Sequence, residues 1–331
     1  MNVTIRGGGV AASCCAHVLG LHGIAASAIR VDRPPLPVVM ISDAALSLVR
    51  DVFGRPGLFA GERRIDRRVV SWGDSDPVAM PHAATIVTGA ALEAALAPAA
   101  PALDDAAPGF HVHAMAPLPD GEVMHFGERR ALATEVTLGD DDDADCCRIE
   151  SLEAGWLFLI PSGAGRAWLL CVGISLDGAL AQSRDIASRI VAGDTPCQSF
   201  DPSPRIATQV TGDDWIGCGT AAIAFDPICG DGTVQAVREA ILAAAVIAAI
   251  ARGGDAQALR AHYGAMLTAT MRRHLQLCAP FYRSGGTGAW WEQAHDALAQ
   301  GHDWCTRRLA AEPEPRYMLR GYELVERAGV A

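Results

Sequence analysis

Three consecutive glycines, Gly7–Gly9, separate two stretches of different periodicity and constrain the fold more than any other feature of the sequence. Asn2–Ile5 before them has the short apolar pattern of a strand, and Ala11–Leu21 after them has the apolar spacing of a helix. Ile24–Val31 then predicts a second strand. A strand, a helix and a second strand in this order predict a parallel β-sheet that begins at the N-terminus.

The glycine turn fits the pattern G-x-G-x-x-G/A of nucleotide-binding turns. Gly7 would make the tight bend, Gly9 would let the backbone approach a pyrophosphate, and the small Ala12 would let the helix pack closely on the strand. The start of the helix adds N–H groups and the positive end of its dipole. We therefore predict a dinucleotide site at Gly7, Gly9, Ala11 and Ala12, although a glycine-rich turn of an ordinary α/β protein has the same pattern.

The end of the second strand departs from this pattern. In dinucleotide sites an acidic residue there binds the adenosine ribose, but here Arg30 stands at the expected position and Asp32 follows two residues later. Arg30 can face a 2′-phosphate, as arginine does in NADP sites, and Asp32 can serve after a slight change of register. Two solvated charges at a strand end are an equally good interpretation.

The charge balance limits the partners. The chain carries 38 acidic and 27 basic residues, so we expect neither nucleic acid nor an anionic membrane as a partner. All 27 basic residues are arginines, which excludes any mechanism that needs a lysine. The apolar run Ala240–Ala251 is too short to cross a bilayer and predicts a buried helix. The sequence does not indicate the oligomeric state.

Ten cysteines are scattered along the chain, and the adjacent pairs Cys14–Cys15 and Cys146–Cys147 lack the C-x-x-C spacing of zinc sites. We therefore predict no metal site and interpret most of these cysteines as small buried residues in a reducing compartment. The uncharged stretch Gly7–Ile29 contains three consecutive glycines and two histidines. A nucleotide turn explains it better than a signal peptide, so we expect a cytoplasmic protein.

A second motif lies far downstream. Residues 219–232 are G-T-A-A-I-A-F-D-P-I-C-G-D-G, and Ala236 and Ala240 follow. This segment resembles the G-D-A-A-x-x-x-D-P-x-x-G-x-G-x-x-x-A-x-x-x-A signature of flavin monooxygenases of the p-hydroxybenzoate hydroxylase superfamily. The resemblance implies FAD as the cofactor and a loop that meets its isoalloxazine ring. The residues that it implies for FAD binding are Thr220, Asp226, Pro227, Gly230, Asp231 and Gly232.

The physical chemistry of this loop agrees with the resemblance. Gly230 and Gly232 let backbone N–H groups meet the ring, and the helix that starts there offers its positive end to the N1–C2 edge of the flavin. Pro227 stiffens the loop. One position departs from the family, because Thr220 stands where the family has the aspartate that binds the ribityl chain. A threonine hydroxyl is neutral and shorter in reach, which weakens the prediction of tight binding.

A third segment narrows the resemblance. Gly155–Pro161 is G-W-L-F-L-I-P and resembles the W-x-W-x-I-P fingerprint of tryptophan-halogenase-like flavoproteins, with Phe158 in place of the second tryptophan. Halogenases of this kind relay hypohalous acid through a lysine, which this chain lacks. The resemblance therefore favours a related branch of maturases, which hydroxylate a tryptophan of a partner enzyme while a tryptophylquinone cofactor is built. The segments around Trp72 and Cys278–Tyr282 resemble that branch too.

The resemblance also implies a reaction. In this superfamily reduced flavin adds dioxygen at C4a, and the hydroperoxide passes an oxygen atom to an electron-rich substrate while the protein orients the flavin and excludes water. The implied substrate is an aromatic small molecule, or a tryptophan of a peptide or protein. No nucleophile–base pair is legible from the spacing. The weak catalytic candidates are His82, His113 and Trp156, each of which can equally be structural.

The reductant and the activity leave alternatives open. The internal D-G fingerprint of hydroxylases, which serves FAD and the pyridine nucleotide, is not recognisable, because Asp120–Gly121 lacks its flanking pattern. We therefore expect a separate reductase or weak use of NAD(P)H. A catalytically degenerate, flavoprotein-like binding protein would explain Arg30 and Thr220. An NAD(P)-dependent dehydrogenase would explain Arg30 but leave residues 226–232 without a purpose.

Together these patterns predict a mixed α/β (α+β) fold. We predict a Rossmann-like FAD-binding domain at residues 1–66, 86–105 and 205–255, a mostly antiparallel substrate sheet at 67–85 and 106–204, and a helical C-terminal region at 256–331. Apolar spacing predicts further helices at Asp43–Phe53, Gly89–Leu96, Leu176–Val191 and Thr233–Arg252. The further predicted strands are Arg68–Trp72, His82–Val87, Phe110–Ala114, Glu122–Phe126, Ala131–Leu138, Gly155–Ile160, Arg166–Ile174, Arg205–Val210 and Trp215–Cys218.

Overall fold

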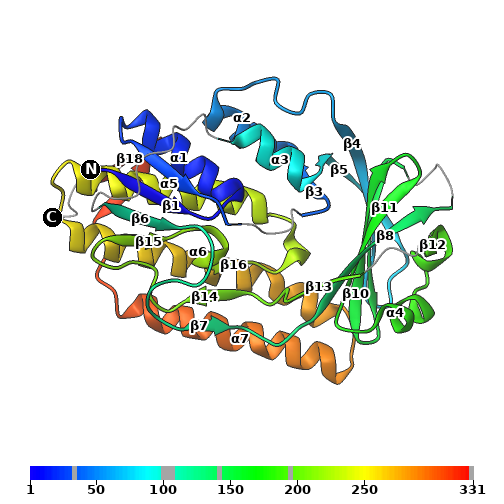
Figure 1. Cartoon of the computed structure of the whole chain (residues 1–331). Coiled ribbons are helices and arrows are strands. Elements are labelled where there is room, and N and C mark those ends of the chain that lie inside the picture. The colour runs from blue at the N-terminus through cyan, green and yellow to red at the C-terminus, as the bar shows by residue number, and fades with distance from the viewer. Residues whose placement is uncertain (32–35, 98–108, 140–143, 193–196, 328–331) are drawn as a thin grey trace.

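The structure of the chain is a computed structural model that describes residues 1–31, 36–97, 109–139, 144–192 and 197–327. A parallel sheet that contains the N-terminal strand lies at one end of the molecule, and a larger mixed sheet stands at the other end (Figure 1). The long helices α6 (Ala256–Ser284) and α7 (Ala289–Ala310) run along one side (Figure 1). This arrangement confirms the predicted mixed α/β class and its helical C-terminal region.

The parallel sheet is formed by β1 (Val3–Arg6), β2 (Ala26–Ile29), β6 (Phe110–His113) and β15 (Trp215–Gly217), in the order β15-β6-β1-β2. α1 (Gly9–Leu21) joins β1 to β2, which run parallel, and this confirms the predicted β-α-β unit. β6 pairs with β1, so our assignment of this segment to the substrate sheet was wrong. Its alternation of buried apolar residues suits either sheet, and the sequence alone could not place it.

Within the described residues the larger sheet has nine strands: eight follow the order β12-β8-β11-β10-β9-β4-β5-β3, and the ninth, β13, pairs with β8. Its neighbours are antiparallel except for β4 and β9, which confirms a mostly antiparallel sheet. β3 belongs here rather than to the FAD-binding domain, because it pairs with β5. The bounds are β3 Val39–Ser42, β4 Arg63–Ser71, β5 Val78–Val87, β8 Ala131–Leu138, β9 Cys146–Leu152, β10 Gly155–Gly163, β11 Arg166–Val172, β12 Ile190–Ala192 and β13 Gln198–Phe200.

The predicted helix Leu176–Val191 is shorter in the structure. α4 spans only Leu176–Gln182, and a 3-10 turn, η2 (Ala187–Arg189), and then β12 follow it. The buried carboxylate of Glu150 accepts hydrogen bonds from the backbone N–H groups of Asp185 and Ile186, at 3.1 and 3.0 Å. A side-chain acceptor of this kind offers the backbone an alternative to the helix, so the helix stops.

The remaining named strands of the described residues form two smaller sheets. β7 (Val123–His125), β14 (Arg205–Ala207) and β16 (Ile223–Ala224) form an antiparallel sheet in the order β16-β14-β7. β17 (Tyr317–Arg320) and β18 (Glu323–Glu326) form an antiparallel hairpin after α7. The C-terminal region is therefore helical only as far as Ala310, and the predicted helical character of its last part was wrong.

Helices α2 (Asp43–Phe53) and α3 (Gly89–Leu96) have the predicted bounds because local caps define them. Ser42 Oγ accepts the N–H of Ala45 at 3.3 Å, and Thr88 Oγ1 accepts the N–H of Ala91 at 3.1 Å. Serine and threonine are favoured N-caps for this reason.

Helix α5 (Gly232–Ala251) fills the centre of the fold. By length and composition it is the one helix among the described residues that could cross a membrane. Most of its apolar stretch is buried inside the protein, where it packs against α1. The core helix of a globular protein has the same properties, as the apolar run Ala240–Ala251 predicts.

Strand β10 separates two cores, because successive side chains of a strand point to opposite faces. Trp156 and Phe158 pack in the main core between the two large sheets and the long helices. Leu157 and Leu159 pack in a second core under α4. Trp156 and Phe158 therefore lie on the face of the large sheet that is turned toward the glycine turn and the downstream motif.

Candidate functional site

The glycine turn has the conformation that its sequence predicts. Gly7 and Gly9 have φ angles of +117° and +79°, which other residues rarely adopt. A Cβ atom on Gly7 would lie 3.1 Å from the backbone nitrogen of Met115, so the bend also needs a glycine for space. Gly8 precedes α1, and a Cβ atom there would meet no other atom within 4 Å. The turn therefore leaves open space beside the start of the helix.

The first turn of α1 offers free hydrogen-bond donors. Among the described residues no side chain caps this helix, and its first turn contains no acidic residue. The first N–H groups of a helix lack partners inside the helix, and together with the helix dipole they attract an anion. The open space beside Gly8 and these donors fit a pyrophosphate group.

The downstream motif reaches this turn through η3 (Gly219–Ala221), which follows the end of β15. A Cβ atom on Gly219 would lie 2.7 Å from the Cβ of Ala11, closer than real Cβ atoms approach. Gly219 also donates its N–H to the buried Glu239 Oε2 of α5 at 3.1 Å. Burial raises the pKa of Glu239, which keeps it neutral. Two motifs about two hundred residues apart thus meet in tight packing.

We call Asp226–Gly232 the Asp-Pro loop. It contains the 3-10 turn η4 (Pro227–Cys229), and Gly230 follows with a left-handed φ of +65°. Asp231 Oδ2 accepts a hydrogen bond from Gln235 Nε2 at 3.0 Å, whereas its buried Oδ1 has no partner among the described residues. A Cβ atom on Gly232 would meet no atom within 4 Å. An orphaned acceptor beside open space at a helix start fits a large polar ligand such as FAD.

The Asp226 side chain turns away from this open space into the protein. Its Oδ2 atom forms a 2.8 Å ion pair with Arg129 Nη1 and accepts the Tyr282 hydroxyl at 2.7 Å. Burial, and then the charge of Asp226, raise the pKa of Tyr282, so that hydroxyl stays protonated and donates. The Arg129 guanidinium lies 4.7 Å from the centre of the Tyr282 ring. Asp226 therefore anchors the loop from the protein interior. Of its two partners, the sequence indicated Tyr282 only as part of the segment Cys278–Tyr282, and it gave no sign of Arg129.

The side chain of His274, on α6, holds the backbone of the same loop. The Nε2 atom of His274 accepts the N–H of Asp226 at 2.8 Å. Burial lowers the pKa of His274, so the ring is neutral in the folded protein and its Nε2 is free to accept. The loop is thus tied to α6 at both the main chain and the side chain of one residue.

Acidification is expected to loosen this attachment. The folded state keeps His274 neutral while the unfolded chain binds a proton near pH 6.5, so the stabilisation is present above that pH and is lost as the pH falls below it. The slope is at most about 1.4 kcal/mol per pH unit for one group. His274→Asn retains an acceptor for the Asp226 N–H but cannot titrate. Urea unfolding at pH 7.5 and 5.5 should show a smaller pH dependence in this variant, and equal slopes would contradict the assignment.

Arg30, Asp32 and Thr220 stand at or near the positions where an acidic residue is expected to bind the cofactor. Arg30 is exposed just after β2, and Asp32 lies outside the described residues. Thr220 is exposed within η3, beside the first turn of α1. The structure thus brings Thr220, Gly7–Ala12 and the start of α5 into one region. That Arg30 or Asp32 binds the adenosine ribose stays a prediction.

His82 is poorly suited to act as a general base, because its basic nitrogen already accepts a hydrogen bond. It lies on β5, and Arg68 Nη2 approaches its Nε2 at 3.1 Å. Because a guanidinium can only donate, Nε2 accepts and the proton of the neutral ring resides on Nδ1. Burial, and then the charge of Arg68, lower the pKa of His82. The basic nitrogen is therefore already in use.

The other two catalytic candidates, His113 and Trp156, lie in different parts of the fold. His113 lies on β6 in the parallel sheet, where its ring packs edge-on against Trp215 with centroids 5.9 Å apart. Burial, and then Arg6, lower the pKa of His113. Trp156 is fully buried and donates its indole N–H to the Tyr282 hydroxyl at 3.3 Å. Trp156 is therefore the candidate that the structure connects to the Asp-Pro loop.

Aromatic side chains surround this connection. Trp291 lies with its ring centre 5.8 Å from that of Tyr282, 4.8 Å from that of Trp290 and 5.6 Å from that of Trp72. Trp156 and Trp291 are fully buried, whereas Trp72 and Trp290 are partly exposed. The cluster thus extends from the interior beside the Asp-Pro loop to the surface between the large sheet and α7.

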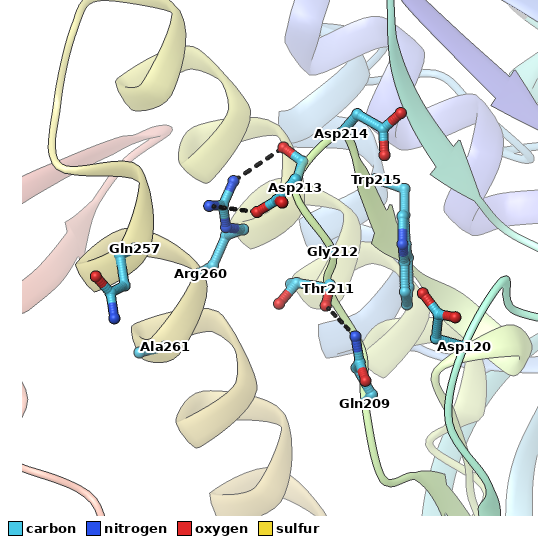
Figure 2. Close-up of a pocket in the computed structure, with 10 residues that line it drawn as sticks. All are labelled: Asp120, Gln209, Thr211, Gly212, Asp213, Asp214, Trp215, Gln257, Arg260 and Ala261. Atoms are coloured by element: carbon cyan, nitrogen blue, oxygen red, sulfur yellow. Dashed lines mark hydrogen bonds and ion pairs between the residues drawn. The ribbon is translucent and has the colours of Figure 1, made fainter.

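A separate pocket opens at the beginning of β15 (Figure 2). Trp215 starts this strand and Thr220 follows its other end, so the pocket lies away from the glycine turn. Arg260 is already bound to Asp213, and the remaining acidic groups repel a phosphate. We therefore do not assign the cofactor to it. The pocket is lined by Asp120, Gln209, Thr211, Gly212, Asp213, Asp214, Trp215, Gln257, Arg260 and Ala261.

Comparison with known proteins identifies the fold. No protein-family model matches the chain, and no curated protein matches it in sequence. Among solved structures, the peptidyl tryptophan dihydroxylase QhpG, described as essential for tryptophylquinone cofactor biogenesis, is 18% identical and has a TM-score of 0.71. The alignment covers 98% of this chain and 86% of QhpG.

Two further structures have the same architecture. The flavin-dependent halogenase CmlS is 16% identical, with a TM-score of 0.73 over 93% of this chain and 71% of its own. The 2,6-dihydroxypyridine-3-hydroxylase from Arthrobacter nicotinovorans is 12% identical, with a TM-score of 0.63 over 87% of this chain and 94% of its own. The chain therefore has the fold of the flavin-dependent hydroxylases and halogenases.

Proposed function

We propose that the chain is an FAD-dependent monooxygenase that hydroxylates an aromatic substrate, with a tryptophan of a peptide or protein as the leading candidate. One observation carries the proposal: Gly219 of the downstream motif packs directly on Ala11 of the glycine turn. The two segments that resemble FAD-binding motifs are thus parts of one region, as a single extended cofactor requires.

The residues of this region divide into binding and positioning roles. The uncapped N–H groups at the start of α1 bind the pyrophosphate, and Thr220 faces the ribityl chain. Gly230 and Gly232 leave room for the ring, while Arg129 and Tyr282 hold the loop in place through Asp226. When bound, FAD supplies the activation of dioxygen.

The substrate side of the proposal rests on the face of β10. Trp156 and Phe158 point from the large sheet toward the cofactor region, and Arg68 lies 5.9 Å from the centre of the Phe158 ring. Such an apolar face excludes water from the space beside it, which suits an indole substrate. QhpG acts on a peptidyl tryptophan, and the likeness to it favours the same class of substrate here.

We also propose that the chain does not halogenate, because the reaction of such halogenases passes through a lysine and this chain has none. The electrons come from NAD(P)H or a separate reductase in this proposal. The alternative is a flavoprotein-like binding protein without catalysis, which the exposed, neutral Thr220 and the exposed Arg30 favour.

Absorption spectroscopy is the first test. We expect purified protein to be yellow, or to bind added FAD with a shifted flavin spectrum. The flavin is then reduced and exposed to air with a tryptophan-containing peptide, and mass spectrometry should show the peptide gaining one oxygen atom. A colourless protein that ignores excess FAD would overturn the proposal, whereas FAD binding without oxygen consumption after reduction would favour the binding protein.

A further inference from the structure

Cys229 of the Asp-Pro loop meets two side chains of α6, His274 and Cys278. Cys229 belongs to η4, and His274 and Cys278 are one turn apart on α6. The Sγ atoms of Cys229 and Cys278 lie 3.3 Å apart, and Cys278 Sγ lies 3.3 Å from His274 Nε2. Cys278 is buried, whereas Cys229 is partly exposed. Within the described part of the chain this group alone has the compactness of a three-ligand metal site.

The hydrogen bonds of His274 argue against a metal ion. Its Nε2 atom already accepts the N–H of Asp226 at 2.8 Å. A neutral imidazole has one proton, which then resides on Nδ1, so neither nitrogen offers a free lone pair. Two thiols remain, which is fewer than the three protein ligands of a catalytic zinc site or the four of a structural one. The group is better described as a thiol pair with a neighbouring imidazole.

We propose that Cys229 and Cys278 are an oxidant-sensitive thiol pair, which forms a disulfide when a hydroperoxide reaches the Asp-Pro loop. Cys229 is the accessible member and attacks the peroxide. With hydrogen peroxide, the thiol gains an oxygen atom as a sulfenic acid and one water leaves. Cys278 then attacks the Cys229 sulfur, so the S–S bond forms, the S–O bond breaks and a second water leaves.

The electrons and protons of this reaction balance. Two thiols lose two electrons and two protons, and hydrogen peroxide takes up both pairs to become two waters. The proton of Cys278 joins the hydroxyl group that leaves the Cys229 sulfur, and together they form the second water. The sulfur atoms need to approach by only about 1.3 Å to reach the length of a disulfide. The resulting bond would join η4 to the middle of α6.

The location suggests the source of the oxidant. A flavin that reacts with dioxygen without hydroxylating its substrate releases hydrogen peroxide, and this release would occur beside the Asp-Pro loop. That source rests on the proposed function, whereas the reactivity of the thiol pair does not. A bond between η4 and α6 would restrict the opening of the loop, so the pair would couple unproductive turnover to a change at the site itself.

Mass spectrometry of the intact chain, reduced and free of FAD, tests the pair. After hydrogen peroxide and then alkylation, we expect Cys229 and Cys278 to lose their free thiols together. A non-reducing digest at arginine should link peptide Ile206–Arg238 to peptide His274–Arg283. The link should vanish in Cys229→Ser, which distinguishes Cys229 from Cys218 in the same peptide. In Cys278→Ser, a sulfenic-acid reagent should label Cys229.

Two cysteines serve as controls. Cys305→Ser, a buried position in α7, should keep the link, and the exposed Cys197 reports that peroxide reached the protein. The proposal is wrong if Cys229 and Cys278 stay fully alkylatable at a peroxide dose that oxidises Cys197. It is also wrong if the purified chain holds one zinc ion that disappears in Cys229→Ser and protects both thiols.

Adding FAD separates this proposal from the preceding one. If the disulfide forms in a chain that cannot bind FAD, the result would support the thiol-pair proposal and overturn the proposed function. FAD binding together with two unreactive thiols would do the reverse.

Discussion

Replacing Arg129 with methionine is expected to lower the free energy of unfolding by about 3–5 kcal/mol. The guanidinium and the Asp226 carboxylate are 3% and 0% exposed and lie 2.8 Å apart. Methionine fills much of the space of the arginine stem but leaves the buried carboxylate with two neutral donors, the Tyr282 hydroxyl and the Ile228 N–H. Removal of one partner from a buried ion pair costs more than the pair itself contributes, because the remaining charge keeps its desolvation penalty.

The exposed pair of Arg64 and Asp43 is the matched control. It has a similar separation, 2.9 Å, but its side chains are 51% and 52% exposed. Arg64→Met should cost less than about 1 kcal/mol, because solvent screens such pairs. Urea unfolding of both variants gives the comparison. Equal small effects would show that Arg129 does not hold the Asp-Pro loop, and Arg129→Met with Asp226→Asn should recover part of the loss.

Replacing Gly8 with valine is expected to weaken FAD binding by roughly a hundredfold, about 2.7 kcal/mol, without weakening the fold. The φ of Gly8 is −142°, an extended conformation that valine adopts readily, and no atom lies within 4 Å of the position of a new Cβ. The apoprotein can therefore accept the side chain. The same side chain would occupy the open space beside the first N–H groups of α1, where we place the pyrophosphate.

Two glycines nearby make this test specific. Gly20→Val adds the same side chain to the same helix, also into open space, and should leave FAD binding unchanged. Gly9→Val should instead destabilise the fold, because the φ of Gly9 is +79°. Titration of each apoprotein with FAD by flavin fluorescence, together with its thermal midpoint, separates the cases. If Gly8→Val bound FAD as tightly as the original chain, the glycine turn would not be the seat of the pyrophosphate.

The local features of the fold could be predicted from the sequence because their determinants are local. The bounds of α2 and α3 follow from caps three residues from their partners, and the β-α-β unit follows from a glycine turn between two periodic segments. The Asp-Pro loop was recognisable because glycine and proline restrict the backbone directly.

The remainder depends on pairing between distant residues. Arg129 lies in the charged stretch Glu128–Arg130, which has the composition of a solvated turn, yet the structure buries it against Asp226. β6 alternates in a way that suits either sheet, and β3 is too short to show its partner. Glu150 ends α4 by a contact across more than thirty residues. A pattern within one segment contains no information about these partners.

The attachment of the Asp-Pro loop to α6 also determines when this region can fold during synthesis on the ribosome. The glycine turn is translated before its counterpart Gly219, and Tyr282, which holds Asp226, is translated after both. Domains tend to fold as units as they emerge, yet this region cannot be complete until Tyr282 has left the exit tunnel. A nascent chain therefore exposes an unfinished glycine turn until that residue emerges.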